Sequence, residues 1–287
     1  MYCDLHTHSV FSDGTWTPSQ IIDQAARQGL TVALTDHNTV SGLPEFLAAA
    51  KARGVEAVAG IEFSTDYMEY DVHVVALFVD AQMYQPIRDY VAQGDSLKEQ
   101  SNRNLVAALN GAGYAISYDR ICAKTPDGRV NRANIAAELV EQGYVPTVKE
   151  AFSQLLSAKR GYYIPPKRPG TYETIEFIRS LGALPVLAHP LLTMSEAELR
   201  RFLPRAVDAG LLAMETAYTT YDAQTTQLAR EIAREYGLLE SGGSDFHGDT
   251  KPGNLLGQGK GTLQMPYEIY LRLKQAHGCT DQPSKRQ

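Results

Sequence analysis

The chain has 287 residues, of which 44% are hydrophobic and 21% charged, and its formal net charge is -6 at pH 7. This composition can build one large domain, and the acidic balance argues against a general nucleic-acid coat protein, which is usually basic. We expect neither a membrane span nor a signal peptide, because no apolar run of about 18 residues occurs and no basic segment precedes an apolar one at the start. Three widely spaced cysteines predict reduced thiols and a cytoplasmic protein.

The first fourteen residues carry the most informative motif. An apolar start predicts a strand, and His6 and His8 follow it two residues apart. On an extended chain such residues point to the same face, so both rings can reach one metal ion. Asp13 lies five residues further on, in a turn-like segment, and imidazole with carboxylate is a typical ligand set for Zn, Mn or Fe. By itself this motif is equally compatible with two surface histidines.

The segments that follow alternate between helix and strand. We expect a helix that begins after Thr17-Pro18 and ends at Gly29, a strand over 31–35, a helix over 43–53 and a strand over 55–61. This alternation predicts a parallel α/β sheet or barrel. Only polar and aromatic turn residues separate Glu62 from the next strand, at 72–79, so that strand should run antiparallel, with His73 near its beginning.

The middle of the chain has a different character. Long helical patterns over 86–110, 133–142 and 147–157 predict an inserted helical subdomain at 81–165, which would cap a barrel made of residues 1–80 and 166–287. The alternation then resumes. Its predicted elements are helices over 172–181, 196–209, 223–236 and 267–276, and strands over 183–188, 211–214 and 238–241.

Ionisable residues gather at the ends of the predicted strands. Six of the seven histidines fall there, together with five carboxylates: His6, His8, His37, His73, His189, His247, Asp13, Asp36, Glu62, Glu215 and Asp245. In α/β sheets and barrels the carboxyl ends of the strands form the functional edge. Without partners, so many ionisable groups at one edge would carry a large desolvation cost, which metal ions would remove. The pattern therefore predicts a polynuclear metal site.

These motifs, in their order along the chain, closely resemble the PHP (polymerase and histidinol phosphatase) family. The residues that carry the resemblance are His6-Thr7-His8, Asp13, Thr35-Asp36-His37, Glu62, His73, Ala188-His189-Pro190, Glu215 and Ser244-Asp245-Phe246-His247. The resemblance implies a distorted (β/α)7 TIM-like barrel. It also implies two or three divalent ions, Mn, Fe or Zn, and the hydrolysis of phosphate esters.

The resemblance also implies how the ligands are grouped. His6, His8, Glu62 and Asp245 would hold one ion, Glu62 with His73 and His189 a second, and Asp13 with His37 and His247 a third. A hydroxide that bridges two ions would attack the phosphorus, since no protein nucleophile is evident. We take His37, His189 and Asp245 as candidate catalytic residues. The proton for the leaving oxygen can come from His189, from His37 or from a bound water, and the sequence does not decide among these. Asp36 is either an orienting partner of a ligand or a simple turn cap.

Basic residues of the insertion are candidates for binding phosphate. Arg132 stands where a helix begins, so its guanidinium and backbone N–H groups can share one phosphate, and Lys159-Arg160 and Lys167-Arg168 follow. The stretches 131–143 and 159–166 resemble the insertion of a PHP subgroup that acts on nucleotides and 3′,5′-bisphosphates. That resemblance implies phosphate contacts for Arg132 and Lys159. Asn134 stands where that subgroup commonly has a histidine. Each basic residue can also be part of a solvated helix face. Tyr218 lies in a segment that we expect to border the site.

The function predicted from these observations is the metal-dependent hydrolysis of a phosphate monoester on a small molecule, most naturally a nucleotide. Four alternatives stay open: a 5′-3′ exonuclease on short RNA or DNA, a sugar-phosphate phosphatase, a histidinol-phosphate phosphatase and an amidohydrolase-type enzyme. A metal-stiffened binding module is a further reading, which the complete ligand set disfavours. We expect no membrane association and no stable nucleic-acid complex, and the sequence does not fix the oligomeric state.

Overall fold

The computed structural model describes residues 1–125, 130–166, 168–261 and 263–280. It divides into two compact units, Met1–Asp89 with Pro169–Gln287, and Tyr90–Arg168. We call the first the barrel unit and the second the inserted unit. The bounds predicted for the inserted subdomain, 81–165, remain a prediction. Its role in selecting the substrate also remains a prediction.

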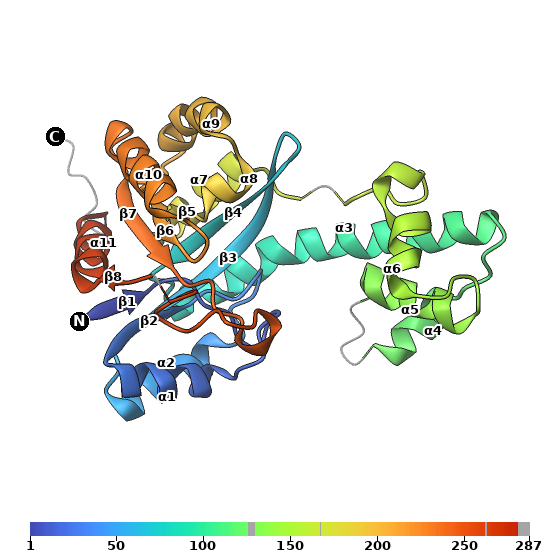
Figure 1. The fold of residues 1–287 in the computed structure, drawn as a ribbon, viewed down its shortest axis with the longest axis horizontal. Helices are drawn as coiled ribbons and strands as arrows, with labels where there is room; N and C mark the ends of the chain where they lie inside the picture. The colour runs from blue at the N-terminus through green and yellow to red at the C-terminus, as the bar shows by residue number, and fades with distance from the viewer. Residues whose placement is uncertain (126–129, 167, 262, 281–287) are drawn as a thin grey trace. The chain divides into compact units, whose positions relative to one another are not determined.

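The barrel unit is built on an eight-stranded sheet with the order β7-β6-β5-β4-β3-β2-β1-β8 (Figure 1). Its strands are β1 (Tyr2–Asp4), β2 (Leu30–Leu34), β3 (Ala57–Tyr67), β4 (Tyr70–Leu77), β5 (Leu184–Leu187), β6 (Ala213–Tyr218), β7 (Leu239–Gly243) and β8 (Met265–Pro266). Neighbours pair in parallel, except that β4 is antiparallel to β3 and β5 and that β8 is antiparallel to β1.

The sheet nearly closes on itself beyond its first strand. The backbone N–H of Asp245 donates to the carbonyl of His6 at 2.9 Å, and that of His8 donates to the carbonyl of Phe246 at 2.8 Å. The chain segments that follow β1 and β7 therefore lie side by side. The predicted fold class, a distorted TIM-like α/β barrel with a helical insertion, is confirmed.

The helices begin and end where local chemistry favours it. The Thr17 side chain caps α1, Pro18 occupies the first helical position, and Gly29 ends the helix in the left-handed conformation, at φ 61°. In the barrel unit α1 packs on α2, α2 on β3, and α10 on β6 and β7 (Figure 1). These helices are α1 (Pro18–Gln28), α2 (Leu43–Arg53), α7 (Thr171–Ser180), α8 (Pro190–Thr193), α9 (Glu196–Asp208), α10 (Ala223–Glu235) and α11 (Tyr267–Thr280).

Apolar side chains fill the interior of the barrel unit. Ala33, Val75, Leu184 and Ala213 come from four different strands and belong to one buried cluster, which α11 joins through Leu273. Burial of this apolar surface is the main favourable contribution to folding. It fixes the sheet edge from which the candidate site residues project.

Two predicted strands are longer than expected. β3 runs on to Tyr67, so the hairpin turn falls near Met68 and Glu62 lies inside the strand. From Phe63 to Asp66 buried and partly exposed residues alternate, which is the pattern of a half-buried strand rather than of a turn. β6 likewise runs on past Glu215, where the pairing register shifts between Glu215 and Ala217. The predicted antiparallel direction of β4 is confirmed.

The inserted unit is helical and has a core of its own. Its helices are the greater part of α3 (Tyr84–Gly111), α4 (Tyr118–Lys124), α5 (Arg132–Glu141) and α6 (Val148–Ala151), followed by a π-helical turn over Phe152–Leu156. Leu105, Leu109, Ile135 and Leu139 are buried together. The helix α4, and α8 and β8 in the barrel unit, were not predicted, because each is too short to show a hydrophobic periodicity. In the described part of the chain, no helix is long and apolar enough to cross a membrane.

Gly243 offers a test of how β1 and β7 approach each other. A Cβ at this position would lie 2.5 Å from the His6 Cβ and 2.8 Å from an Asp4 carboxylate oxygen. We expect Gly243→Ala to destabilise the protein by about 1–3 kcal/mol through overpacking. Gly94→Ala is the matched control, because a Cβ in that helix meets nothing within 4 Å. It should leave the thermal midpoint unchanged or raise it. Equal midpoints for the two variants would contradict the close approach.

Candidate metal centre

The candidate site lies at one edge of the barrel unit and draws on every part of its sheet. His6 and His8 follow β1, His37 follows β2, Glu62 lies in β3 and His73 in β4. The others come from the second half of the chain: His189 begins α8, Glu215 lies in β6, and Asp245 and His247 follow β7. Residues far apart in the sequence meet here because parallel strands place their carboxyl ends at the same edge.

Glu62 is the centre of the arrangement and is fully buried. Its Oε2 lies 3.2 Å from His6 Nε2, 3.3 Å from His8 Nε2 and 3.0 Å from His37 Nδ1. Its Oε1 lies 2.9 Å from His73 Nδ1 and 3.2 Å from His189 Nε2. Five imidazole rings thus face one carboxylate.

The side chains form four overlapping groups whose ligand atoms lie within 4.8 Å of one another. The groups are His8, Asp13, His37 and His247; His6, Glu62 and His189; His6, His8 and Asp245; and His37, Glu62 and His73. Together they include all nine of the candidate metal ligands and the three candidate catalytic residues. The grouping differs in detail from the one the resemblance implies, since His8 also joins the group of Asp13.

Two rings are oriented by acceptors at their Nδ1 atoms. His6 Nδ1 lies 2.9 Å from Glu215 Oε1, and His247 Nδ1 lies 2.9 Å from the backbone carbonyl of Asp245. An acceptor at Nδ1 favours the tautomer with the proton there, which leaves the lone pair of Nε2 to face the cluster. Glu215 also accepts the backbone N–H of His189, at 2.7 Å. It therefore fixes two candidate ligands at once.

A second layer of carboxylates holds the loops. Asp36 accepts hydrogen bonds from the Ser9 N–H at 2.7 Å and from the Ser12 hydroxyl at 2.6 Å, which fixes the loop that carries Asp13. Asp36 is therefore more than a turn cap.

Asp4 is buried and accepts the N–H and hydroxyl of Ser244 and the N–H of Gly257, at 2.8, 2.6 and 2.8 Å. It thus joins the start of the chain to the segments on both sides of Asp245.

The backbone is strained at two site residues. His189 has φ 30° and Asp245 φ 51°, in the left-handed region that residues with a side chain rarely adopt. Such conformations cost about 1–3 kcal/mol each and persist where the surrounding structure enforces them, commonly at functional sites. Here the hydrogen bonds that the His189 N–H donates to Glu215 and the Asp245 N–H donates to the His6 carbonyl hold these conformations.

The charges of the cluster are strongly coupled. Burial opposes ionisation of Glu62, yet the surrounding imidazoles hold its pKa well below the usual range. Burial lowers the pKa of the histidines, but Glu62 raises the pKa of His37, and Glu62 with Asp71 raises the pKa of His73 to about 10. Glu62 and Glu215 likewise raise the pKa of His6 well above its ordinary value. Without a metal ion, protons on the rings balance the carboxylates.

The residues present fit divalent metal ions. Among the described residues, Glu62 Oε2 and the Nδ1 atoms of His8, His37 and His189 are buried without a hydrogen-bond partner. Unsatisfied buried polar atoms are costly, and two of these, Glu62 Oε2 and His37 Nδ1, lie 3.0 Å apart within the cluster. Imidazole and carboxylate groups at this spacing suit Zn, Mn or Fe. The chemistry of the donors therefore supports an ion site.

Two further side chains touch Asp245 and add to the predicted set. Tyr218 is buried and donates its hydroxyl to Asp245 Oδ2 at 2.7 Å, and Lys251 Nζ lies 2.7 Å from the same oxygen. Burial and the Asp245 charge raise the pKa of Tyr218 well above its ordinary value, so the hydroxyl keeps its proton. Sequence reasoning missed Lys251, although it is the only basic residue between Arg234 and Lys260.

Arg132 and Asn134 belong to the inserted unit. The Arg132 guanidinium lies over the rings of Tyr163, at 4.3 Å, and Phe152, at 5.7 Å, so aromatic contacts hold it at the start of α5. Asn134 Oδ1 accepts the backbone N–H of Asn131, at 2.8 Å, in a capping box. The Asn134 side chain therefore already has a structural partner.

The other predicted basic residues lie further along the inserted unit. Lys159 and Arg160 are exposed in a single 3₁₀ turn, and the Arg160 Nε donates to the Ser153 carbonyl at 2.9 Å. Arg168 is described and has interactions of its own, while Lys167 lies outside the described residues.

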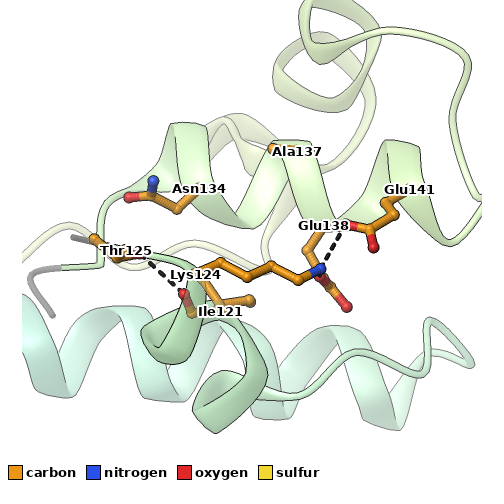
Figure 2. Close-up of a pocket in the computed structure, with 7 residues that line it drawn as sticks. All are labelled: Ile121, Lys124, Thr125, Asn134, Ala137, Glu138 and Glu141. Carbon is orange, nitrogen blue, oxygen red and sulfur yellow. Dashed lines mark hydrogen bonds and ion pairs between the residues drawn. The ribbon is translucent and has the colours of Figure 1, made fainter.

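A shallow pocket of the inserted unit lies between α4 and α5 (Figure 2). Asn134, Lys124 and Glu138 are among the residues that line it. The Lys124 ammonium lies 2.9 Å from Glu138 and 2.5 Å from Glu141, so its charge is already balanced within the pocket wall.

Residues 4–164 match the model of the PHP domain, and this match establishes the family. The chain belongs to the PHP family. It is 32% identical to a 5′-3′ exoribonuclease of Haemophilus influenzae, over 85% of this chain and 89% of that protein. It is also 32% identical to a 3′,5′-nucleoside bisphosphate phosphatase of Chromobacterium violaceum, over 88% of this chain and 90% of that protein.

A solved structure agrees with this membership. A protein of Bifidobacterium adolescentis, described as a candidate metal-dependent phosphoesterase, superposes with a TM-score of 0.72 and 28% identity, over 98% of this chain and 97% of that chain. The predicted enzyme class, a hydrolase of phosphoric esters that depends on divalent metal, is confirmed at the level of the family. The number and kind of the ions and the roles of single residues stay predictions.

The raised histidine pKa values predict that metal binding releases protons. In the metal-free protein the nearby carboxylates raise the pKa values of His6, His37 and His73 and so favour protonated rings, and a ring must lose its proton to bind an ion. We therefore expect Mn²⁺ binding to release protons and to become tighter as the pH rises. Calorimetry in two buffers of different ionisation enthalpy measures this release. His73→Gln should lower it by about one proton. A binding heat that is the same in both buffers would contradict the assignment.

Proposed function

We propose that the chain is a metal-dependent phosphomonoesterase that acts on a nucleotide. The observation that carries this proposal is the buried Glu62 carboxylate, with five imidazole rings around its two oxygens. An arrangement in which each carboxylate oxygen faces different rings supports the binding of more than one ion. The strand edge that carries it is the functional edge of barrel enzymes.

We propose two or three divalent ions, Mn, Fe or Zn, held by His6, His8, Asp13, His37, Glu62, His73, His189, Asp245 and His247. When bound, such ions neutralise phosphoryl oxygens and lower the pKa of a coordinated water, which makes it a nucleophile at neutral pH. Glu215 orients His6 and His189, and Asp36 holds the loop of Asp13. The chain thus keeps the ligands in place before substrate arrives.

His37 and His189 are the candidate ring donors of a proton to the leaving oxygen. The His37 side chain is 24% exposed and that of His189 9%, so we favour His37 as the ring that a substrate can reach. Asp245 is buried at the cluster, where its Oδ1 lies 3.2 Å from His8 Nε2. Its proposed role is to hold an ion on the side of the site closed by Tyr218 and Lys251.

The inserted unit supports a nucleotide as the substrate. Arg132 is half-buried at a helix start, where its guanidinium suits a phosphate. The expected share of the backbone is reduced, because the Asn131 side chain already accepts the N–H groups of Ala133 and Asn134. Lys159, Arg160 and Asn134 are the other candidate substrate contacts in this unit. Lys159 and Arg160 are exposed in a 3₁₀ turn, so we rank them after the half-buried Arg132 as candidate phosphate contacts.

A second candidate function is the removal of nucleotides from the 5′ end of short RNA. It is favoured by the Haemophilus influenzae relative, which is as similar to this chain as the bisphosphate phosphatase is. One name describes the cleavage of RNA and the other the removal of phosphate from a nucleoside bisphosphate, so both reactions hydrolyse a phosphate ester and differ in the group that leaves. An amidohydrolase-type reaction would use a similar set of ligands.

The deciding experiment measures phosphate and nucleotide release with Mn²⁺ and with EDTA. The panel holds nucleoside mono- and bisphosphates, sugar phosphates, histidinol phosphate and short oligonucleotides. Metal-dependent phosphate release that is fastest from a mononucleotide or bisphosphate is the expected result. Mononucleotides released from oligonucleotides only would establish the exonuclease instead. Silence across the panel, with metal bound, would reject both.

Removing one candidate ligand should abolish activity. We expect His6→Ala to lose an ion and to lower kcat by more than about 100-fold, because even outer partners of ligands contribute 10–100-fold. Metal content and activity are measured together. His277→Ala is the control, since this histidine stacks on Phe78 and belongs to none of the four groups. Full activity and metal content in His6→Ala would exclude the ligand assignment.

Arg132 offers a separate test of the inserted unit. If it binds substrate phosphate, Arg132→Ala should lower kcat/KM by about 10–100-fold through a loss of charge-assisted hydrogen bonds. Metal content should not change, and Arg132→Lys should recover part of the loss. An unchanged kcat/KM on the best substrate would remove Arg132 from the phosphate site.

A further inference from the structure

Lys251 is a cation placed directly against the candidate ion site. Its Nζ lies 2.7 Å from Asp245 Oδ2, while the other oxygen of that carboxylate, Oδ1, faces His8 Nε2 at 3.2 Å and His6 Nε2 at 3.8 Å. Among the described residues, it is the only lysine or arginine in contact with one of the nine candidate ligands. One carboxylate therefore separates the ammonium from the rings.

The loop that carries Lys251 is fixed on both sides of the site. The N–H of Asp249 donates to the Thr15 hydroxyl at 2.8 Å, and the Thr250 hydroxyl donates to the Asp13 carbonyl at 3.1 Å. On the other side of the site, the Asn254 side-chain amide donates to the Ser244 and Asp245 carbonyls. Lys251 thus has a defined place between two segments that carry candidate ligands.

Asp245 does not need Lys251 to hold its orientation. Tyr218 already donates to the same oxygen, Oδ2, at 2.7 Å, and it does so from a buried position. The two donors differ in exposure and charge. The Tyr218 ring is buried and neutral, whereas the Lys251 side chain is 43% exposed and carries a full charge.

The exposure of Lys251 leaves it with unused bonding capacity. An ammonium has three N–H donors, and the contact with Asp245 occupies one of them. The remaining donors can bind an anion that enters the site, and a lysine suits phosphate as a point charge. The inference requires a phosphoryl group bound at the candidate ion site to bring an outer oxygen past Asp245 to within reach of this ammonium.

We infer that Lys251 is a phosphate-binding residue of the barrel unit, which contacts an oxygen of the phosphoryl group while Asp245 holds an ion. This inference rests on the proposed function for the position of the phosphoryl group. It assigns a substrate contact to a residue outside the ligand set and outside the insertion. Tyr218, by contrast, is assigned only a positioning role toward Asp245.

Matched variants separate binding from positioning. Lys251→Met removes the charge and keeps the length of the side chain, Lys251→Arg keeps the charge, and Tyr218→Phe removes only the buried donor to the same oxygen. The dissociation constant of inorganic phosphate is measured by calorimetry on the Mn²⁺-loaded protein, and metal content is measured on the same samples. Thermal midpoints show whether each variant folds.

We expect Lys251→Met to weaken phosphate binding by at least about 10-fold. Lys251→Arg and Tyr218→Phe should stay within about 3-fold of the unaltered protein when compared at equal metal loading. Equal weakening in Lys251→Met and Tyr218→Phe would reduce Lys251 to a positioning residue and overturn the inference. Unchanged phosphate binding in Lys251→Met, or no recovery in Lys251→Arg, would overturn it as well.

The outcome can be told apart from a failure of the proposed function. Phosphate binding that depends on Lys251 in a protein that hydrolyses nothing on the substrate panel would reject the phosphatase and keep the inference. Turnover of a nucleotide by a Lys251→Met variant that binds phosphate normally would reject the inference and keep the phosphatase.

Discussion

The rest of the structure depends on the Glu62 carboxylate, which is inaccessible to solvent. Glu62 is fully buried in β3 with five imidazole rings around it. A lone buried carboxylate would carry a large desolvation cost, so its charge has to be matched by ring protons or by metal ions. Because those two partners exclude each other on any one ring, the state of the whole cluster follows metal supply and pH together. The surrounding carboxylates, Glu215 above all, keep the rings oriented in either state.

Much of this site could be predicted because its chemistry is written into short local motifs. His6-Thr7-His8 and Ser244-Asp245-Phe246-His247 each join two candidate ligands on a chain end that leaves a strand, and strand ends are easily located between helices with clear caps. The period-two pattern beyond Glu62 was harder to interpret, because aromatic and polar residues such as Tyr67 and Asp66 occur equally in turns and in half-buried strands. Glu215 could be placed at this edge from the sequence, but its contact with His6 joins residues 209 positions apart, which no spacing along the chain reveals. Lys251 lies only six residues from Asp245, but no motif marks it.

The two units carry different kinds of charged residues. The sequence alone indicates this difference only through composition. The candidate ligands of the barrel unit are mostly buried, and their charges compensate one another. The inserted unit has its own apolar core and carries its cations at helix starts and on exposed turns. If the insertion selects the substrate, as we propose, substrate preference can change without disturbing the candidate ion site. This fits a family whose members bear names as different as exoribonuclease and bisphosphate phosphatase.

The contacts of Asp4 set an order of events during synthesis. Asp4 precedes its partners Ser244 and Gly257 by 240 and 253 residues, and the loop of Asp13 likewise waits for Thr250. Domains generally begin to fold from their N-terminal part on the ribosome, but here the two ends of the barrel must meet before the ligands converge. A chain that ends before residue 245 holds His6 and His8 without Asp245 or His247. An ion site that needs both segments is thus completed only when the two ends of the barrel have met.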